Sequence, residues 1–102
     1  MHKSVIVDKI GDDKLGLIKY LKEMADLSLK EAKELMDYLN ENDSTTLITG
    51  IDQEKAREIA DSLTKLKCSI QVKDTKISDV MLAFPKDKNS YEMIFLSGVK
   101  RV

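Results

Sequence analysis

The stretch Gly-Asp-Asp-Lys-Leu-Gly-Leu-Ile-Lys at residues 11–19, followed by Asp-Leu-Ser-Leu-Lys-Glu-Ala-Lys-Glu-Leu-Met-Asp at residues 26–37, decides the fold predicted for this chain. Ser28 is followed three residues later by Glu31. In this capping box each side chain can satisfy a free amide of the first helical turn. The pattern therefore predicts a helix that begins after Ser28, preceded by a loop and another helix.

Both predicted helices carry an apolar stripe. Between residues 14 and 25, apolar side chains recur at Leu17, Leu21 and Met24, which is the spacing of one helical face. The second helix repeats this spacing and is expected to bury one stripe. Its members are Leu29, Ala32, Leu35, Met36 and Leu39.

Strand patterns flank the helices. Short β-branched runs occupy residues 4–8 and 45–49, and residues 67–73 alternate between apolar and polar side chains. We expect Gly50 to end the second of these strands and Asp52 to cap a third helix. The predicted order is strand-helix-helix-strand-helix-strand. This order indicates the α+β class, built as a two-layer sandwich.

The C-terminal part of the chain predicts an added β-hairpin. Residues 80–84 and 91–96 are apolar enough for strands, with a turn at residues 85–90 between them. We divide the chain into a domain at residues 1–74 and a hairpin extension at residues 75–102, packed on the same domain. The hairpin either extends the sheet or packs on its open face. It can also offer an edge to a partner or to a second copy, forming a homodimer.

Composition indicates a cytoplasmic domain. The chain has 102 residues and a net charge of −1, from 17 Lys and Arg against 18 Asp and Glu, so no overall field attracts nucleic acid or an anionic membrane. The single cysteine, Cys68, cannot form an intrachain disulfide, which is typical of a reducing compartment. No segment approaches the ~20 apolar residues of a membrane span. The N-terminus lacks the apolar run of a signal peptide.

The helical pair resembles the C-terminal domain of the bacterial ribosomal stalk protein. In that family a glycine loop leads into Lys-x-x-x-Ile-Lys, which residues 14–19 match, and Leu-Lys-Glu-Ala-Lys opens a second helix, as at residues 29–33. The resemblance covers residues 4–73 and is strongest over residues 11–37. It implies three helices packed on one face of a three-stranded sheet. It also implies a bacterial protein that docks translational GTPases on the ribosome.

Two features depart from the family pattern. Where the family usually has glycines around the turn between the helices, this chain has Asp26 and Ser28, which predicts a less tight turn. The sequence also begins at its first strand, without the helical dimerisation segment and the Ala/Gly/Pro-rich hinge that tether the family's domain to the ribosome. We therefore expect a role different from that of an ordinary stalk protein.

The first helix carries the candidate partner-binding surface. At about 100° per residue, Leu15 and Ile18 are expected on a different side of the helix from the apolar stripe. A helix that buries one face needs no apolar residue on another, so this side is a candidate contact surface, rimmed by lysines. In the resemblance these positions meet the acidic surface of a translation factor. The predicted residues are Lys14, Leu15, Ile18, Lys19, Lys22, Lys30 and Lys33.

A structural alternative also accounts for these residues. Leu15 and Ile18 can be covered by the second helix or by the C-terminal tail, in which case the lysines only solvate that side. The sequence leaves both interpretations open.

No catalytic, metal or cofactor site is predicted. The only histidine, His2, lies near the terminus, so no Ser-His or Cys-His pair has a positioned base. Cys68 lies on the apolar face of a predicted strand, where a small core residue is far commoner than a nucleophile. No spacing places three acidic residues on one face beside a neutral ligand. The glycines form no phosphate-binding loop. We expect a protein that is not an enzyme.

Two other functions remain as alternatives. The ClpS-type protease adaptor shares this topology, and the polar connector at residues 40–50 would suit it, but its pocket histidine and Asn-Thr-Met segment have no counterpart here. Binding of RNA by the lysines of the helical pair is the weaker alternative. Steep salt dependence would distinguish an RNA complex from an apolar protein contact.

Overall fold

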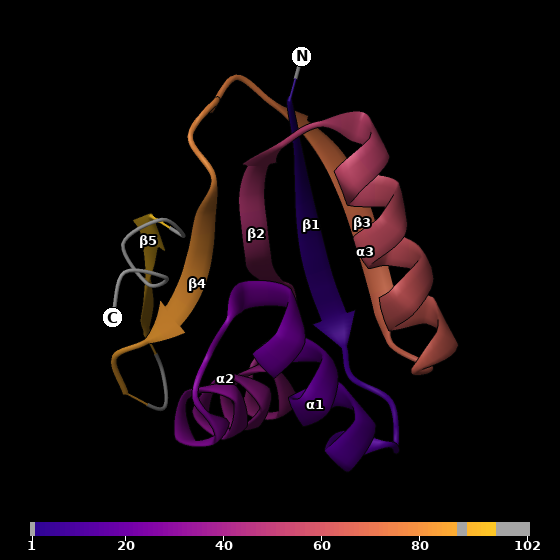
Figure 1. Cartoon of the computed structure of the whole chain (residues 1–102), viewed down its shortest axis with the longest axis vertical. Helices are drawn as coiled ribbons and strands as arrows, with labels where there is room; N and C mark the ends of the chain where they lie inside the picture. Colours follow the sequence, from indigo (N-terminus) through magenta and orange to yellow (C-terminus); the bar gives the residue numbers. More distant parts are fainter. Residues whose placement is uncertain (1, 88–89, 96–102) are drawn as a thin grey trace.

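The computed structural model describes residues 2–87 and 90–95, which form five strands and three helices (Figure 1). The strands are β1 (His2–Lys9), β2 (Thr45–Ile51), β3 (Ser69–Thr75), β4 (Met81–Pro85) and β5 (Tyr91–Phe95). The helices are α1 (Lys14–Ala25), α2 (Leu29–Glu41) and α3 (Gln53–Lys65). The sheet has the order β3-β1-β2-β4-β5, and every neighbouring pair is antiparallel. The predicted α+β sandwich and its order of elements are confirmed.

The helices form one layer against the sheet. α3 packs along β3 and β1, α2 packs against β4 and β1, and α1 lies mainly against α2. Figure 1 shows α3 beside β1 and β3, with the α1 and α2 pair at the end of the sheet to which β1 runs. The core fills the space between the layers. Its largest fully buried side chains are Val5, Val7, Leu17, Leu21, Leu35, Leu39, Leu47, Ile48, Ile59, Leu63 and Leu82.

Side-chain caps fix where each helix begins. The predicted capping box is present, because the amide of Glu31 donates to Ser28 Oγ at 3.1 Å and the amide of Ser28 donates to Glu31 Oε1 at 2.9 Å. The carboxylate of Asp13 caps α1 by accepting a hydrogen bond from the amide of Gly16. The carboxylate of Asp52 caps α3 by accepting one from the amide of Lys55. Each cap satisfies an amide that the helix leaves free. Local sequence therefore sets the starting points of all three helices among the described residues.

The turn from α1 to α2 occupies only residues 26–28 and contains no glycine. Asp26 takes the left-handed conformation, with φ of 54° and ψ of 44°, and its amide donates to the carbonyl of Lys22. The amide of Leu27 donates to the same carbonyl at 3.0 Å. Asp26 thus adopts the left-handed conformation that glycine usually supplies at the end of a helix. The turn is therefore short, although the absence of glycine predicts a less tight one.

We expect Asp26→Gly to raise the free energy of unfolding by about 0.5–1 kcal/mol, because glycine adopts this conformation without the steric cost of a Cβ. Chemical denaturation of the two proteins measures the difference. Asp26→Ala is the control, since it removes the same carboxylate but keeps the Cβ, and it should not stabilise. Equal changes in both variants would assign the effect to the charge rather than to the backbone.

β2 pairs with β1 through two register shifts, one on each side of Val5. Leu47 and Ile48 are therefore both buried, although strict alternation would turn one of them to the other face. Gly50 lies within the strand with φ of +78°, and β2 continues to Ile51. The prediction that Gly50 ends this strand is wrong, because the irregular register lets the chain pass through a positive φ and remain paired.

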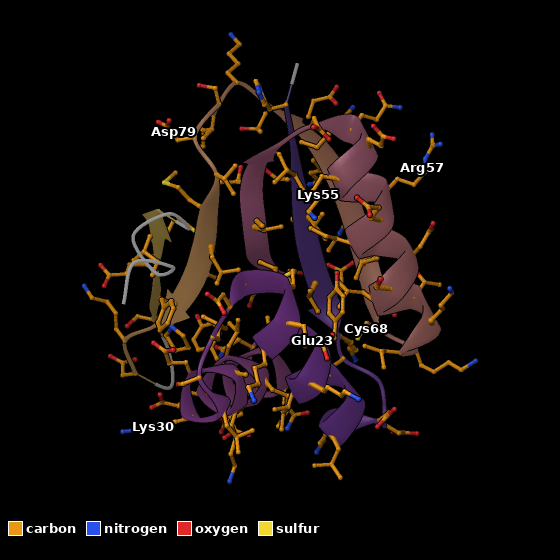
Figure 2. All side chains as sticks on the ribbon, in the orientation of Figure 1. Glu23, Lys30, Lys55, Arg57, Cys68 and Asp79 are labelled. Atoms are coloured by element: carbon orange, nitrogen blue, oxygen red, sulfur yellow. The ribbon has the colours of Figure 1, made fainter. Side chains whose placement is uncertain are left out.

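The added hairpin extends the sheet along the free side of β2, which is one of the two arrangements expected. A Cβ on Gly50 would lie 1.9 Å from the carbonyl oxygen of Asp79, so only glycine leaves room for the segment that leads into β4. Figure 2 shows Asp79 just before β4. Leu82 of β4 pairs with β2 and is fully buried. Of the predicted hairpin, residues 88–89 and Leu96 lie outside the described residues.

β3 forms one edge of the sheet, and none of its residues is fully buried. Lys67 has φ of 66°, so it belongs to the turn after α3, and the strand predicted from residue 67 begins at Ser69. Cys68 is buried and Ile70 is half-buried, whereas Val72 is 43% exposed. The expected alternation is therefore present, but only part of the apolar side of this edge strand is covered by the rest of the protein.

Candidate functional site

The exposed side of α1 carries an apolar residue among charges. Leu15 is 81% exposed, more than any other large apolar side chain among the described residues. Lys19 and Lys22 follow it by four and seven residues and are also exposed. At 3.6 residues per turn, residues with these spacings project from the same side of a helix. We call Leu15, Lys19 and Lys22 the α1 stripe.

Ile18 does not belong to this exposed side. It is 8% exposed and forms part of the core, so the expectation that it is available to a partner is wrong. The reason is that α1 packs against α2 as well as facing the core, which widens its buried arc beyond the stripe of Leu17 and Leu21. Ile18 lies one turn before Leu21 and two turns before the buried Ala25, on that wider arc.

The beginning of α2 also departs from the expected burial. The helical spacing predicts that Leu29 belongs to the buried stripe, but its side chain is 63% exposed. It is the first residue of the helix, directly after the Ser28 cap, at the margin of the buried stripe. Lys30 and Lys33 beside it are exposed as predicted. The exposure of Leu29 could be read from its place as the first residue of α2, because no preceding turn of that helix can cover its side chain.

The predicted residues come from two helices, α1 and the start of α2. Because only residues 26–28 join the helices, the start of α2 lies beside the end of α1. Lys30 and Lys33 therefore belong to the part of α2 that follows the turn, while Lys14 and Leu15 lie at the far end of the 12-residue helix α1. A helix of this length spans about 18 Å. Figure 2 shows Lys30 projecting from the helical pair, away from Glu23 of α1.

A shallow groove between α1 and α3 adjoins the α1 stripe. Its lining includes Gly16, Lys19, Tyr20, Glu23, Ser62 and Lys65. Burial raises the pKa of Tyr20, the charge of Glu58 raises it further, and a hydrogen bond with Ser62 opposes both effects. Tyr20 is therefore a neutral hydrogen-bonding group at pH 7. Lys65 adds a positive charge that sequence reasoning missed, because it comes from α3, remote in sequence.

The groups considered for chemistry are placed as follows. Cys68, expected in the core, is buried, and burial raises the pKa of its thiol, opposed by a hydrogen bond with the backbone of Gly11. A raised pKa keeps the thiol protonated and unreactive. Residues 2–87 and 90–95 contain no group of three His, Cys, Asp or Glu side chains able to hold a metal ion. Within the same residues, no helix has the length and apolar character needed to cross a membrane.

Comparison with known proteins identifies relatives. The family model of the ribosomal protein L7/L12 C-terminal domain matches residues 3–73 of this chain. The large ribosomal subunit protein bL12 of Listeria welshimeri is 37% identical over 70 residues, covering 69% of this chain and 55% of that protein. The Bacillus pumilus protein of the same name is 41% identical over 63 residues, covering 62% and 49%. That of Petrotoga mobilis is 33% identical over 69 residues, covering 68% and 53%.

The chain thus spans about half the length of the curated relatives it matches. The matched residues run from β1 into β3 and include all three described helices, whereas β4 and β5 follow the match. Membership of a family of ribosomal proteins confirms the prediction that the chain is not an enzyme. The resemblance drawn from the helical pair is confirmed as well: this chain belongs to the ribosomal protein L7/L12 C-terminal domain family.

Proposed function

We propose that this chain is a protein-binding domain that docks a translational GTPase, or another ribosome-associated protein, through α1 and the start of α2. The observation that carries the proposal is Leu15, which is 81% exposed beside Lys19 and Lys22 on a helix whose other side already supplies the core. Membership of a ribosomal protein family supports a partner from the translation machinery.

The chemistry of the surface suggests the chemistry of its partner. Covering a leucine side chain contributes about 1.5–3 kcal/mol, so Leu15 suits an apolar hollow on the partner. Lys14, Lys19 and Lys22 suit carboxylates around that hollow, which would increase the rate of association and its salt dependence. Leu29, with Lys30 and Lys33, offers a second contact of the same character. Ile18 packs in the core on the buried side of α1, so it is not a contact residue in this proposal.

Charge reversal of the α1 stripe tests the proposal. We expect Lys19→Glu combined with Lys22→Glu to weaken binding to a purified translational GTPase by ~10-fold or more at low salt, because attraction becomes repulsion. Both lysines are exposed, so the free energy of unfolding should change by no more than about 0.5 kcal/mol. Isothermal titration calorimetry measures the affinity, and thermal unfolding measures the stability.

The matched control reverses two cations on α3. Lys55→Glu combined with Arg57→Glu makes the same change in net charge at exposed positions, and Figure 2 shows both residues on α3 rather than on α1 or α2. This control should bind normally. Equal weakening in both double variants would mean that only overall charge matters. Unchanged affinity in the α1 variant would remove the proposed surface, and a large fall in its melting temperature would show that these lysines are structural.

Leu15→Ala tests the apolar part of the same contact. We expect it to weaken binding ~10-fold at any salt concentration, since the lost contact is apolar, while stability stays unchanged because the side chain is exposed. Titrations at two ionic strengths separate it from the lysine variant, whose effect should shrink in high salt. An unaltered affinity would exclude Leu15 from the interface. If the chain instead binds RNA with an affinity that falls steeply as salt is added, the nucleic-acid alternative would be favoured.

A further inference from the structure

The two outer strands of the sheet, β3 and β5, differ in how their edges are protected. β3 reads Ser-Ile-Gln-Val-Lys-Asp-Thr, in which only Ile70 and Val72 are apolar. β5 reads Tyr-Glu-Met-Ile-Phe, in which Glu92 is the only charged residue and neither Lys nor Pro occurs. Charged side chains, above all Lys, and proline are the usual means by which an edge strand avoids pairing with another chain. The edge of β5 has little of this protection.

The outer side of β5 is available for pairing. Within residues 2–87 and 90–95, β5 pairs with β4 alone, and it ends the strand order of the sheet. Figure 1 shows β5 as the outermost strand beside β4. β5 also lies beyond residues 3–73, the part that matches the family. This edge is therefore a feature of the chain that the family match does not cover.

The register of the hairpin indicates which backbone groups of β5 point away from β4. The amide of Lys86 donates to the carbonyl of Ser90 at 3.0 Å, so these two opposite residues form a hydrogen-bonded pair. Hydrogen-bonded and non-hydrogen-bonded pairs alternate along an antiparallel ladder. Pro85 and Tyr91, the next pair, are therefore non-hydrogen-bonded, which agrees with the missing amide hydrogen of proline.

The same alternation divides the rest of β5. Glu92 and Ile94 direct their backbone amides and carbonyls toward β4. Tyr91, Met93 and Phe95 direct theirs toward the free side of the strand. No other strand of the described residues pairs with that side. Every second residue of β5 thus offers a donor and an acceptor to an added strand.

These outward groups are self-complementary. When two β5 strands are related by a two-fold axis at Met93, each Met93 lies opposite the other, and Tyr91 lies opposite Phe95 of the second copy. All of these positions have outward backbone groups, so each pair can exchange two hydrogen bonds. An axis at Glu92 would instead place two like charges directly opposite each other, which is destabilising. The axis at Met93 is therefore the favoured register.

We propose that two copies of this chain pair through antiparallel β5 strands about Met93 and join their sheets into one continuous sheet. The interface is isologous, since the same strand serves both copies. An edge contact of this length belongs with small, transient interfaces, for which we expect a dissociation constant of about 10–100 µM. It uses no residue of the α1 stripe, so the inference is independent of the function proposed for α1.

Amide hydrogen exchange of the unmodified full chain tests the inference position by position. Nuclear magnetic resonance measures the exchange rates at about 50 µM and about 1 mM, concentrations that change the free monomer fraction ~3-fold for the expected dissociation constant. We expect the outward amides of Tyr91 and Met93 to exchange ~3-fold more slowly at the higher concentration, because an added strand bonds them. The amides of β3, at the opposite edge, should change by less than ~1.5-fold.

Met93→Lys and Met93→Glu test the two-fold axis. Since residue 93 of one copy faces residue 93 of the other, each variant alone sets like charges opposite each other and should stay monomeric in sedimentation velocity up to about 1 mM. An equimolar mixture of the two variants should associate again. The matched control, Val72→Lys and Val72→Glu, makes the same changes at a partly exposed position of β3 and should associate like the unmodified chain.

Thermal unfolding establishes that each variant is folded, and the exchange measurement needs no variant, so it decides the matter if a Met93 variant does not fold. A monomeric unmodified chain at about 1 mM, or equal slowing of exchange in β3 and β5, would overturn the inference. So would a Met93→Lys protein that still associates, folded Met93 variants that remain monomeric when mixed, or loss of association in the Val72 variants.

Discussion

Truncation after Asp74 is expected to abolish the cooperative unfolding transition of this chain or to cause aggregation. β4 shields one side of β2, and its Leu82 and Ala83 are fully buried. Burial of a leucine or a similar side chain contributes about 1.5–3 kcal/mol, while the whole stability of a small domain is about 5–15 kcal/mol. Without β4, β2 would also become an edge strand with unpaired backbone groups.

Thermal unfolding and analytical ultracentrifugation of the intact and shortened chains measure this effect. The point variant Leu82→Ala is a second test that keeps the chain length, and it should cost about 2–5 kcal/mol because it leaves a cavity in the core. A shortened chain that is monomeric and unfolds cooperatively with unchanged stability would show that the hairpin is an independent appendage. If the intact chain is a dimer and the shortened chain a folded monomer, the hairpin is an assembly element and its partner is a second copy.

Gly50→Ala is expected to destabilise the protein by roughly 2–5 kcal/mol. A left-handed conformation costs about 1–2 kcal/mol for a residue with a Cβ, and Gly50 has φ of +78°. The new Cβ would also lie 1.9 Å from the carbonyl oxygen of Asp79. That oxygen belongs to the backbone, so no side-chain rotation can relieve the contact, and forced repacking typically costs about 1–3 kcal/mol.

Gly50→Asn separates the two causes. Asparagine tolerates positive φ better than alanine does, but it has the same Cβ. Denaturant titration should therefore find both variants destabilised, with Gly50→Asn less affected by about 1 kcal/mol. A Gly50→Ala protein within about 0.5 kcal/mol of the original would show that the segment around Asp79 moves aside freely.

The helical pair could be predicted from the sequence because its signals are local. The capping box of Ser28 and Glu31 involves residues three apart, and it appears in the structure as expected. The stripes of Leu17 with Leu21 and of Leu35 with Leu39 repeat after one helical turn, and these residues are buried as the period predicts. Such signals need no knowledge of which element lies alongside, so the class and the order of elements followed from them.

The errors fall where a distant contact overrides the local pattern. Gly50 was expected to end a strand, but the register of β1 on one side and Asp79 on the other let the strand continue through it. Periodicity places Ile18 away from the apolar stripe but leaves open whether another element covers that side of α1, and the structure buries Ile18 in the core. The exposed Leu29 shows the reverse error, since an apolar residue in register with a stripe can lie beyond the layer that covers it.

A groove beside α2 is not predicted from the sequence for the same reason. Glu34, Asp37 and Glu41 are visible in the sequence as a charged helix side, which is ordinarily a solvated surface. Only the three-dimensional structure brings Pro85, Lys86 and Asp87 to the other wall of the groove that these residues line with Tyr38. That contact has no signature within one segment of the chain.

Nuclear magnetic resonance titration of the isotope-labelled chain with a purified translational GTPase tests the proposed function most directly. Backbone amide signals report each position separately, so the measurement locates the contact without any mutation. We predict that the signals of residues 14–22 and 29–33 shift or broaden first, and that those of β3 stay in place. An unperturbed spectrum, or changes confined to β3 and α3, would contradict the proposal that this domain binds its partner through α1 and the start of α2.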